Sequence, residues 1–418
     1  MRSKKEQSSS IVSVSSNLTS EIGLLAETSW EVCNKIGGIY AVLSTKARQL
    51  KEQFGDSLIF IGPDVWTERN PSPYFKEKKT LLKNAASKLQ LPWGITIRTG
   101  RWDIPGTPIV ILVNPGQTGE HIDSVYAKVW EKYGVDSLHA YGDYDESCIF
   151  SVASAIVLKE LASHLKIEDK KVLAHFDEWT TGMGLLYTQM TMPDASTVFT
   201  THATSIGRSI CGNGKPLYEY FRNYNGDQMA GELNMQSKHS LEKATAHAAD
   251  CFTTVSEVTA RECEQLLDIR PQVVTPNGFE PDFVPRTNKY NKLRRDGRQH
   301  LLDIAHALTG RHYGENTFLI ATSGRLEYRN KGLDLFLDSI VTIEEQLPED
   351  AEALAFVLVP GWVKEPSGSL LTTLKFNGDD HSGPDFLTHR LNNEDYDPVC
   401  CRIRGLNSEN KGKKIKII

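Results

Sequence analysis

Short apolar segments alternate along this chain with segments of helical periodicity, and this alternation constrains the fold more than any other feature. Strands are predicted at residues 24–26, 58–62, 95–98, 108–113, 172–175, 196–201, 251–255 and 273–275. Alternating strands and helices are typical of a parallel sheet with helices on both faces. In such sheets ligands bind at the carboxyl ends of the strands. We therefore expect polar residues that follow the strands to form a site.

The same pattern starts again after residue 281. A basic helix is predicted over residues 292–308, followed by strands at 318–322 and 354–359 and an apolar segment at 415–418. Residues 281–289 are interpreted as a linker. The sequence thus predicts an N-terminal Rossmann-like lobe over residues 21–280 and a partial C-terminal one over 281–418. Residues 1–20 are rich in serine and are predicted to be a flexible tail.

Composition excludes several classes of protein. The 418 residues are 39% hydrophobic and 24% charged, which is typical of a soluble globular protein. A net charge of -6 gives no overall attraction for nucleic acid, and no apolar run approaches the roughly 20 residues that span a bilayer. The seven cysteines show no zinc spacing, so we expect reduced thiols and a cytoplasmic location. No nucleic-acid or membrane partner is expected, and a homo-oligomer is left open.

A polar loop after the first strand ends in two glycines, Gly37 and Gly38, where a helical pattern begins. Glycines let a ligand approach the backbone, and free N–H groups at a helix start favour an anion. Lys35 adds a positive charge beside them. These three residues are predicted to bind a phosphate group, although an ordinary tight turn fits the same short motif about as well.

Two polar segments follow later strands. His202 and Arg208 come after the strand at residues 196–201, where a lone histidine is more often structural than functional. The segment around Asp177 reads His175-Phe176-Asp177-Glu178-Trp179. An imidazole and two carboxylates could hold a metal, but only three ligands lie together, so a metal site is disfavoured here.

Arg325 and Lys331 flank a turn that leads into a helix of the second lobe. A guanidinium and an ammonium near a helix start suit a pyrophosphate group. The alternative is a solvated charged loop, because Glu327 and Arg329 between them are charged as well.

Taken together, these motifs and their order resemble the glycogen synthases of animals and fungi. The segments that carry the resemblance are residues 30–43, 100–102, 175–179, 200–208, 246–247, 250–256, 276–278 and 324–332. The resemblance runs from about Leu24 to Pro360. It implies the GT-B arrangement of two Rossmann-like lobes facing a cleft. It also implies a retaining glycosyltransferase that moves glucose from UDP-glucose to the non-reducing 4-hydroxyl of glycogen or another α-1,4-glucan, without a metal or cofactor.

The resemblance also implies roles for single residues. The matching arginine and lysine of the family bind the UDP phosphates, which places Arg325 and Lys331 in that role. The matching histidine and arginine contact the sugar nucleotide, which assigns His202 and Arg208. Asp177 stands where the family carries a histidine and is the catalytic candidate. If that histidine acts through its backbone carbonyl, aspartate can replace it; if it acts through the imidazole, the mechanism differs here.

Two further departures from the family leave alternatives open. The family carries a late Glu-Pro-x-Gly segment with a second glutamate, whereas the local match Glu365-Pro366-Ser367-Gly368 comes too early and is interpreted as a turn. The arginine-rich regulatory helix is also missing. The chain therefore resembles compact, unregulated members and is expected to have an incomplete second lobe. A non-catalytic glucan-binding homologue and a synthase that uses ADP-glucose are the alternative functions.

Overall fold

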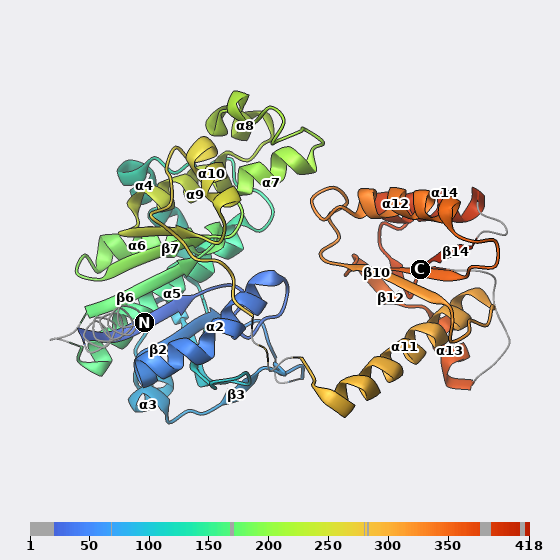
Figure 1. Cartoon of the computed structure of the whole chain (residues 1–418). Helices are drawn as coiled ribbons and strands as arrows, with labels where there is room; N and C mark the ends of the chain where they lie inside the picture. The colour runs from blue at the N-terminus through green and yellow to red at the C-terminus, as the bar shows by residue number, and fades with distance from the viewer. Residues whose placement is uncertain are drawn as a thin grey trace, which may run out of the picture. The chain divides into compact units, whose positions relative to one another are not determined.

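The computed structural model describes residues 21–67, 69–167, 171–279, 281, 284–376, 386–409 and 414–418. The tail predicted at residues 1–20 lies outside this part of the chain. The chain divides into two compact units (Figure 1). Unit 1 contains residues 1–210 and 215–280, and unit 2 contains residues 211–214 and 281–418.

Unit 1 is built on one nine-stranded sheet with the order β3-β4-β5-β2-β1-β6-β7-β8-β9. The strands are β1 (Ile22–Thr28), β2 (Leu58–Pro63), β3 (Phe75–Glu77), β4 (Thr96–Trp102), β5 (Ile109–Asn114), β6 (Lys171–Asp177), β7 (Ser196–Thr201), β8 (Cys251–Thr254) and β9 (Val273–Val274). From β5 to β9 all neighbours run parallel, as predicted, whereas β3 and β4 add an antiparallel edge.

One predicted boundary at this edge is wrong. Residues 100–102 were expected in the loop between two strands, but they belong to β4, where Gly100 pairs with Val110. Trp102 is fully buried, which explains why the strand continues. A Cβ atom at Gly100 would lie 2.4 Å from the carbonyl oxygen of Lys76. Only glycine at this position therefore allows β3 to pack this closely against β4.

Helices cover both faces of this sheet, because successive strand residues point to opposite sides. The helices are α2 (Gly38–Phe54), α3 (Leu81–Lys88), α4 (Ile122–Tyr133), α5 (Tyr144–Leu165), α6 (Gly182–Thr191), α7 (Ser205–Gly212), α8 (Gly226–Glu232), α9 (Gln236–Ala248) and α10 (Glu257–Leu266). In β2, Leu58 and Phe60 pack in one core cluster with Leu43 of α2. Ile59 and Ile61 pack in the other, which includes α5 and α6.

Helix α5 is long and apolar enough to cross a membrane, which the sequence pattern did not suggest. However, 67% of its apolar window is buried inside unit 1. Phe150, Val157 and Leu161 all belong to the core cluster beside the sheet. Burial in the protein core therefore accounts for the apolar character of α5.

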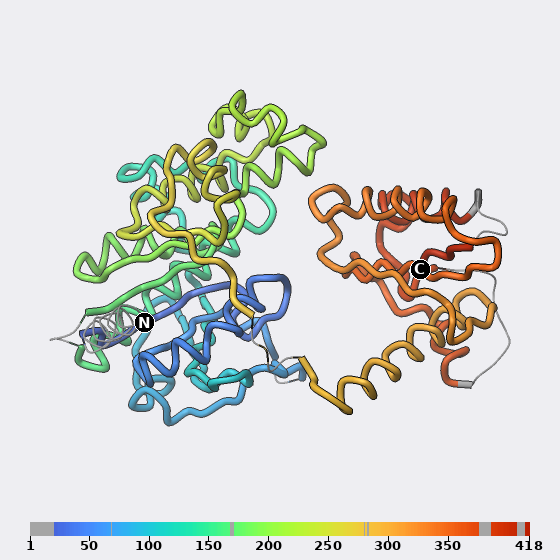
Figure 2. Tube along the Cα trace, in the orientation of Figure 1, coloured from blue at the N-terminus to red at the C-terminus, as the bar shows by residue number. Residues whose placement is uncertain are grey.

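Unit 2 has a second, smaller parallel sheet with the order β10-β11-β14 and a separate antiparallel pair, β12 and β13. Its strands are β10 (Phe318–Ser323), β11 (Ala353–Leu358), β12 (Val363–Pro366), β13 (His389–Leu391) and β14 (Ile415–Ile417). Its helices are α11 (Thr287–Thr309), α12 (Leu333–Gln346), α13 (Gly368–Phe376) and α14 (Pro398–Glu409). The last residues of the chain thus add a strand to the sheet of unit 2 (Figure 2). Both units are α/β, which confirms the predicted fold class.

Two predictions in unit 2 need correction. Helix α11 begins at Thr287, so the last residues of the predicted linker are helical. Glu365 and Pro366 do not form a turn; they lie in β12 and pair with Arg390 and His389 of β13. The segment Glu365–Gly368 was predicted as a turn because β12 forms only by pairing with β13, which lies more than 20 residues away in the sequence. Local sequence contains no signal for such a partner.

Candidate functional site

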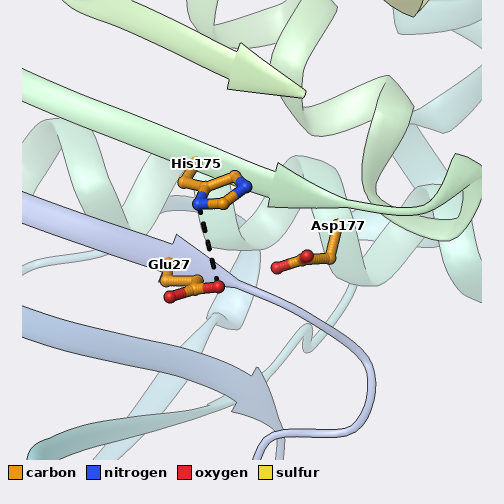
Figure 3. Close-up of side chains that lie close together, drawn as sticks. All are labelled: Glu27, His175 and Asp177. Carbon is orange, nitrogen blue, oxygen red and sulfur yellow. Dashed lines mark ion pairs between the residues drawn. The ribbon is translucent and has the colours of Figure 1, made fainter. Parts of the chain in front are cut away.

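Polar side chains gather at the carboxyl ends of β1, β6 and β7, which are neighbours in the sheet of unit 1. Glu27 lies near the end of β1 and is in register with His175 of β6. Asp177 ends β6 and is in register with Thr200 of β7. Figure 3 shows the side chains of Glu27, His175 and Asp177 close together. The predicted site edge is therefore occupied by ionisable groups.

Asp177 is an ionised carboxylate paired with His202. Its side chain is buried, and Nε2 of His202 lies 3.3 Å from its Oδ1. Burial alone would raise the pKa of Asp177, but the charge of Lys46 and the hydrogen bond and charge of His202 hold that pKa well below its usual range. Burial would lower the pKa of His202, yet the carboxylates of Asp177 and Glu178 raise it. The structure thus brings two predicted site residues into one ion pair.

His175 is a neutral imidazole with a fixed tautomer. Burial lowers its pKa to about 4. Its Nε2 lies 2.7 Å from Oγ1 of Thr200, which lies 2.6 Å from Oγ1 of Thr253. Thr253 donates its hydroxyl proton to the carbonyl of Phe199, so Thr200 must donate to Thr253 and His175 must donate to Thr200. The proton therefore sits on Nε2, and Nδ1 presents a lone pair.

That lone pair points toward a second buried carboxyl group. Nδ1 of His175 lies 3.7 Å from Oε1 of Glu27 (Figure 3). The pKa of Glu27 is raised to about 8, because burial and the nearby Asp177 carboxylate outweigh the opposing effect of Lys46. Lys46 of α2 forms an ion pair with this same Oε1 atom. An ammonium group therefore supplies the positive charge that these acceptors need.

Glu27, His175 and Asp177 have the composition of a metal site, and their ligand atoms all lie within 4.8 Å of one another. The Lys46 ammonium already contacts Glu27, and its charge would repel a metal cation at this position. We therefore interpret the group as a protein ion-pair cluster rather than a metal ligand set, and we call it the Lys46 cluster: Glu27, Lys46, His175, Asp177 and His202.

Three buried carboxylates hold the loop between β7 and α7, which carries His202. Oε1 of Glu178 accepts a hydrogen bond from the backbone N–H of His202 at 2.9 Å. Glu242 accepts from the hydroxyl of Thr201 at 2.7 Å and from the N–H of Ser205 at 2.8 Å. The third carboxylate, that of Glu262 in α10, accepts a hydrogen bond from the hydroxyl of Thr204 at 2.9 Å. The loop is thus fixed by groups from three other elements.

The backbone of Glu178 is itself strained. Its φ is 66° and its ψ is 163°, a combination that residues other than glycine rarely adopt. The N–H of Glu178 donates to the carbonyl of Thr200 at 2.8 Å, and its side chain binds His202. Strain next to Asp177, kept in place by two hydrogen bonds, is typical of a functional site.

Arg208 lies in α7, and its backbone N–H donates to Thr204 at 3.0 Å. Burial raises the pKa of Glu178, and the charges of His202 and Arg208 act against that rise. The charge of Arg208 therefore acts on Glu178, at the same edge of the sheet as His202 and Asp177. Its contact with a sugar nucleotide stays a prediction.

The loop of Gly37 and Gly38 differs from expectation. Helix α2 does begin at Gly38, but Oε2 of Glu31 accepts hydrogen bonds from the N–H groups of Gly37 and Tyr40, both at 2.8 Å. An internal carboxylate thus takes two of the N–H groups that were expected to be free. Lys35 is exposed, with Nζ 5.7 Å from the ring centroid of Tyr40. Phosphate binding by this loop stays a prediction.

Arg325 and Lys331 belong to unit 2 and follow β10. Nε of Arg325 lies 3.0 Å from Oε1 of Glu327, and the arginine side chain is 40% exposed. Gly332, with φ 62°, precedes α12, so Lys331 does lie next to a helix start. Their predicted role toward phosphates is not decided by these contacts.

Sequence reasoning missed Glu27, Lys46, Glu242 and Glu262. Glu27 directly follows the predicted first strand, and that position was the available signal. The others lie in helices, and Glu242 and Glu262 bind residues 37 to 58 positions away in the chain. A single sequence contains no local signal for such partners.

A family model described as glycogen synthase matches residues 27–365. The liver glycogen [starch] synthase of Homo sapiens is 32% identical over 349 residues, covering 81% of this chain and 48% of the human protein. The glycogen [starch] synthase of Neurospora crassa is 32% identical over 343 residues, with 81% of this chain and 48% of the fungal one covered. The chain spans about half the length of these curated relatives.

Among solved structures, the UDP-forming alpha,alpha-trehalose-phosphate synthase from Burkholderia vietnamiensis aligns with a TM-score of 0.48 at 12% identity. That alignment covers 95% of this chain and 72% of the other. The family match is far more specific, because it includes every predicted site residue from Lys35 to Lys331. The chain belongs to the glycogen synthase family.

Proposed function

We propose that this chain is a retaining glucosyltransferase that moves glucose from UDP-glucose to the non-reducing 4-hydroxyl of an α-1,4-glucan such as glycogen. Membership of the glycogen synthase family supports this reaction. The observation that carries it is the ionised Asp177, buried at the carboxyl edge of the sheet and paired with His202. A charged pair at this edge can stabilise the charges that develop when a glycosidic bond to a phosphate breaks.

In the proposed reaction, the bond between C1 of glucose and the diphosphate oxygen breaks, and its electron pair leaves with UDP. A bond forms between C1 and the acceptor oxygen, whose proton passes to the departing diphosphate. Positive charge develops on the sugar ring and negative charge on the diphosphate. Asp177 acts on the sugar side, where a fixed carboxylate stabilises positive charge. The Asp177 side chain is fully buried, whereas that of His202 is 11% exposed, so Asp177 acts through its charge and through the imidazole that it holds.

In the proposed reaction, fixed positive groups stabilise the negative charge that develops on the diphosphate. In unit 1 we assign this role to His202, Arg208, Lys35 and the loop of Gly37 and Gly38. Gly38 is not bound by Glu31, so its N–H is the group we assign to the phosphates. Within unit 2, Arg325 and Lys331 are the residues to which we assign phosphate binding. With these cations the proposal needs no metal.

A cytoplasmic location completes the proposal. It fits the cysteine usage of the sequence, in which seven cysteines show no zinc spacing.

The purified chain should be incubated with glycogen and either UDP-[14C]glucose or ADP-[14C]glucose. Incorporation from UDP-glucose, released by α-amylase, is the expected result. Incorporation from ADP-glucose alone would overturn the donor assignment. If neither donor reacts while the chain still co-sediments with glycogen, the protein is a non-catalytic glucan-binding homologue, which the replacement of the family histidine by Asp177 would then explain.

A further inference from the structure

The Lys46 cluster contains more hydrogen-bond acceptors than donors. The Nδ1 lone pair of His175 and Oε1 of Glu27 face each other at 3.7 Å, and Oδ2 of Asp177 is buried without a donor among the described residues. Such groups repel one another unless a proton or a cation lies among them. Glu27, whose pKa is raised to about 8, can hold such a proton near pH 7, and the Lys46 ammonium supplies the cation.

Lys46 is the cation in contact with this cluster. It projects from α2, forms an ion pair with Glu27, and its side chain is 30% exposed. Against burial, Glu27 and Asp177 raise the pKa of Lys46, so the ammonium stays charged. After burial, the charge of Lys46 is the next cause that acts on the pKa of Asp177, and it lowers that pKa. The charge of Lys46 therefore lowers the pKa values of Glu27, His175 and Asp177.

We propose that Lys46 is a positioning residue of the transferase site: its ammonium is the resident cation of the cluster and, through Glu27 and the neighbouring Asp177, holds the imidazole of His202 in place. This inference rests on the proposed function. Lys46 acts on the substrate through Asp177 and His202 and is not assigned a contact of its own. No mobile cation is then required between Glu27, His175 and Asp177.

The test compares Lys46→Met with Lys46→Arg and with a matched control, Lys51→Met. Lys51 lies on the same helix and pairs with Asp56, away from the cluster. We expect kcat of Lys46→Met to fall about tenfold or more, the range found when residues that orient site ligands are removed. The KM for glycogen should stay within about twofold, and Lys51→Met should behave as the wild type does.

Chemical rescue separates positioning from a merely structural role. Because Lys46 is partly exposed, ethylammonium can enter the space that the truncated side chain leaves. We expect ethylammonium to restore part of the kcat of Lys46→Met and to leave Lys51→Met unchanged. Lys46→Arg, which keeps the charge, should retain more activity than Lys46→Met. Equal loss in both variants without rescue would overturn the proposal, as would an unchanged kcat.

A second readout does not require activity. Lys46 acts to lower the pKa of His175, so the histidine carbon signals of labelled protein should show that pKa rising in Lys46→Met and staying near 4 in Lys46→Arg. An unchanged titration of His175 would overturn the placement of Lys46 as the cation. If the wild type transfers no glucose from any donor, the proposed function fails, and this titration still tests the cluster.

Discussion

Nε2 of His202 donates a hydrogen bond across 3.3 Å to Oδ1 of Asp177, because an ionised carboxylate can only accept. This contact joins the end of β6 to the loop after β7. It links two residues that family resemblance implicates separately, one as the catalytic candidate and one as a sugar-nucleotide ligand. It also means that a change at either residue alters the charge of the other.

Asp177→Asn tests that coupling. Asparagine keeps the shape of the side chain but removes the charge that raises the pKa of His202, so this pKa should fall. NMR titration of the histidine side chains measures the change. A pKa of His202 that stays the same in Asp177→Asn would show that the contact is not an ion pair.

Glu242 is expected to stabilise the loop that carries His202. Glu242→Ala leaves the buried N–H of Ser205 and the hydroxyl of Thr201 without their acceptor, which should cost about 1–3 kcal/mol in the free energy of unfolding. Glu242→Gln keeps an acceptor and should lose less. Urea denaturation measures both. As a control, Glu257→Ala removes an exposed ion pair with Arg270 and should change stability by less than about 0.5 kcal/mol. Similar losses at both positions would contradict this role.

His175 should make stability depend on pH. Its pKa is lowered from 6.5 to about 4 in the folded chain, so between these values the unfolded chain binds a proton that the folded chain does not. Stability contributed by the neutral imidazole is therefore present above about pH 6.5 and lost as the pH falls toward 4. His175→Gln should weaken the decrease in unfolding free energy between pH 6.5 and 4.5. An identical decrease in both proteins would refute the assignment.

Gly37 and Gly38 should respond in opposite ways to alanine. A Cβ at Gly37 would lie 2.8 Å from Oε1 of Glu31, whereas a Cβ at Gly38 meets nothing within 4 Å. Gly37→Ala should displace the carboxylate that caps α2 and cost about 1 kcal/mol. Gly38→Ala should be neutral or stabilising by up to about 1 kcal/mol, since alanine favours the helix. Thermal unfolding of both variants checks the difference.

The same pair tests the proposed phosphate contact. If the diphosphate approaches the N–H of Gly38, the added methyl group should raise the KM for UDP-glucose in Gly38→Ala while its stability is retained. An unchanged KM for UDP-glucose would remove this loop from the donor site.

Arg325→Ala should slow glucose transfer severely without changing the fold. The side chain is 40% exposed and forms an ion pair with Glu327, so its loss should alter the unfolding free energy by less than about 0.5 kcal/mol. Arg402→Ala is the matched control, because Arg402 forms a similar exposed pair with Asp338 in the same unit. Normal turnover of Arg325→Ala would exclude the arginine from the donor site.

Much of unit 1 was predictable because strands buried on both faces are almost continuously apolar, as in β2 and β5. The strand-end rule also located Asp177 and His202 correctly at one edge. Strand β12 and helix α13 were missed, since β12 is defined by pairing with β13 and the segment of α13 has no clear apolar period.

Within the site, Lys46 and Glu242 could not be found from sequence. Each lies on a helix whose position over the sheet edge is set by packing, and each meets partners from other elements. The glycine loop shows the opposite error. Its local pattern suggested free N–H groups, but Glu31, six residues before Gly37, folds back to bind them.

The central claim is that an ionised Asp177 takes part in glucose transfer, and single-turnover transfer tests it most directly. Wild type and Asp177→Asn should be mixed with UDP-[14C]glucose and excess glycogen after circular dichroism has shown that both are folded. We predict rapid incorporation by the wild type and a rate at least about 100-fold lower for the variant. Equal rates of incorporation by the two proteins would contradict the account.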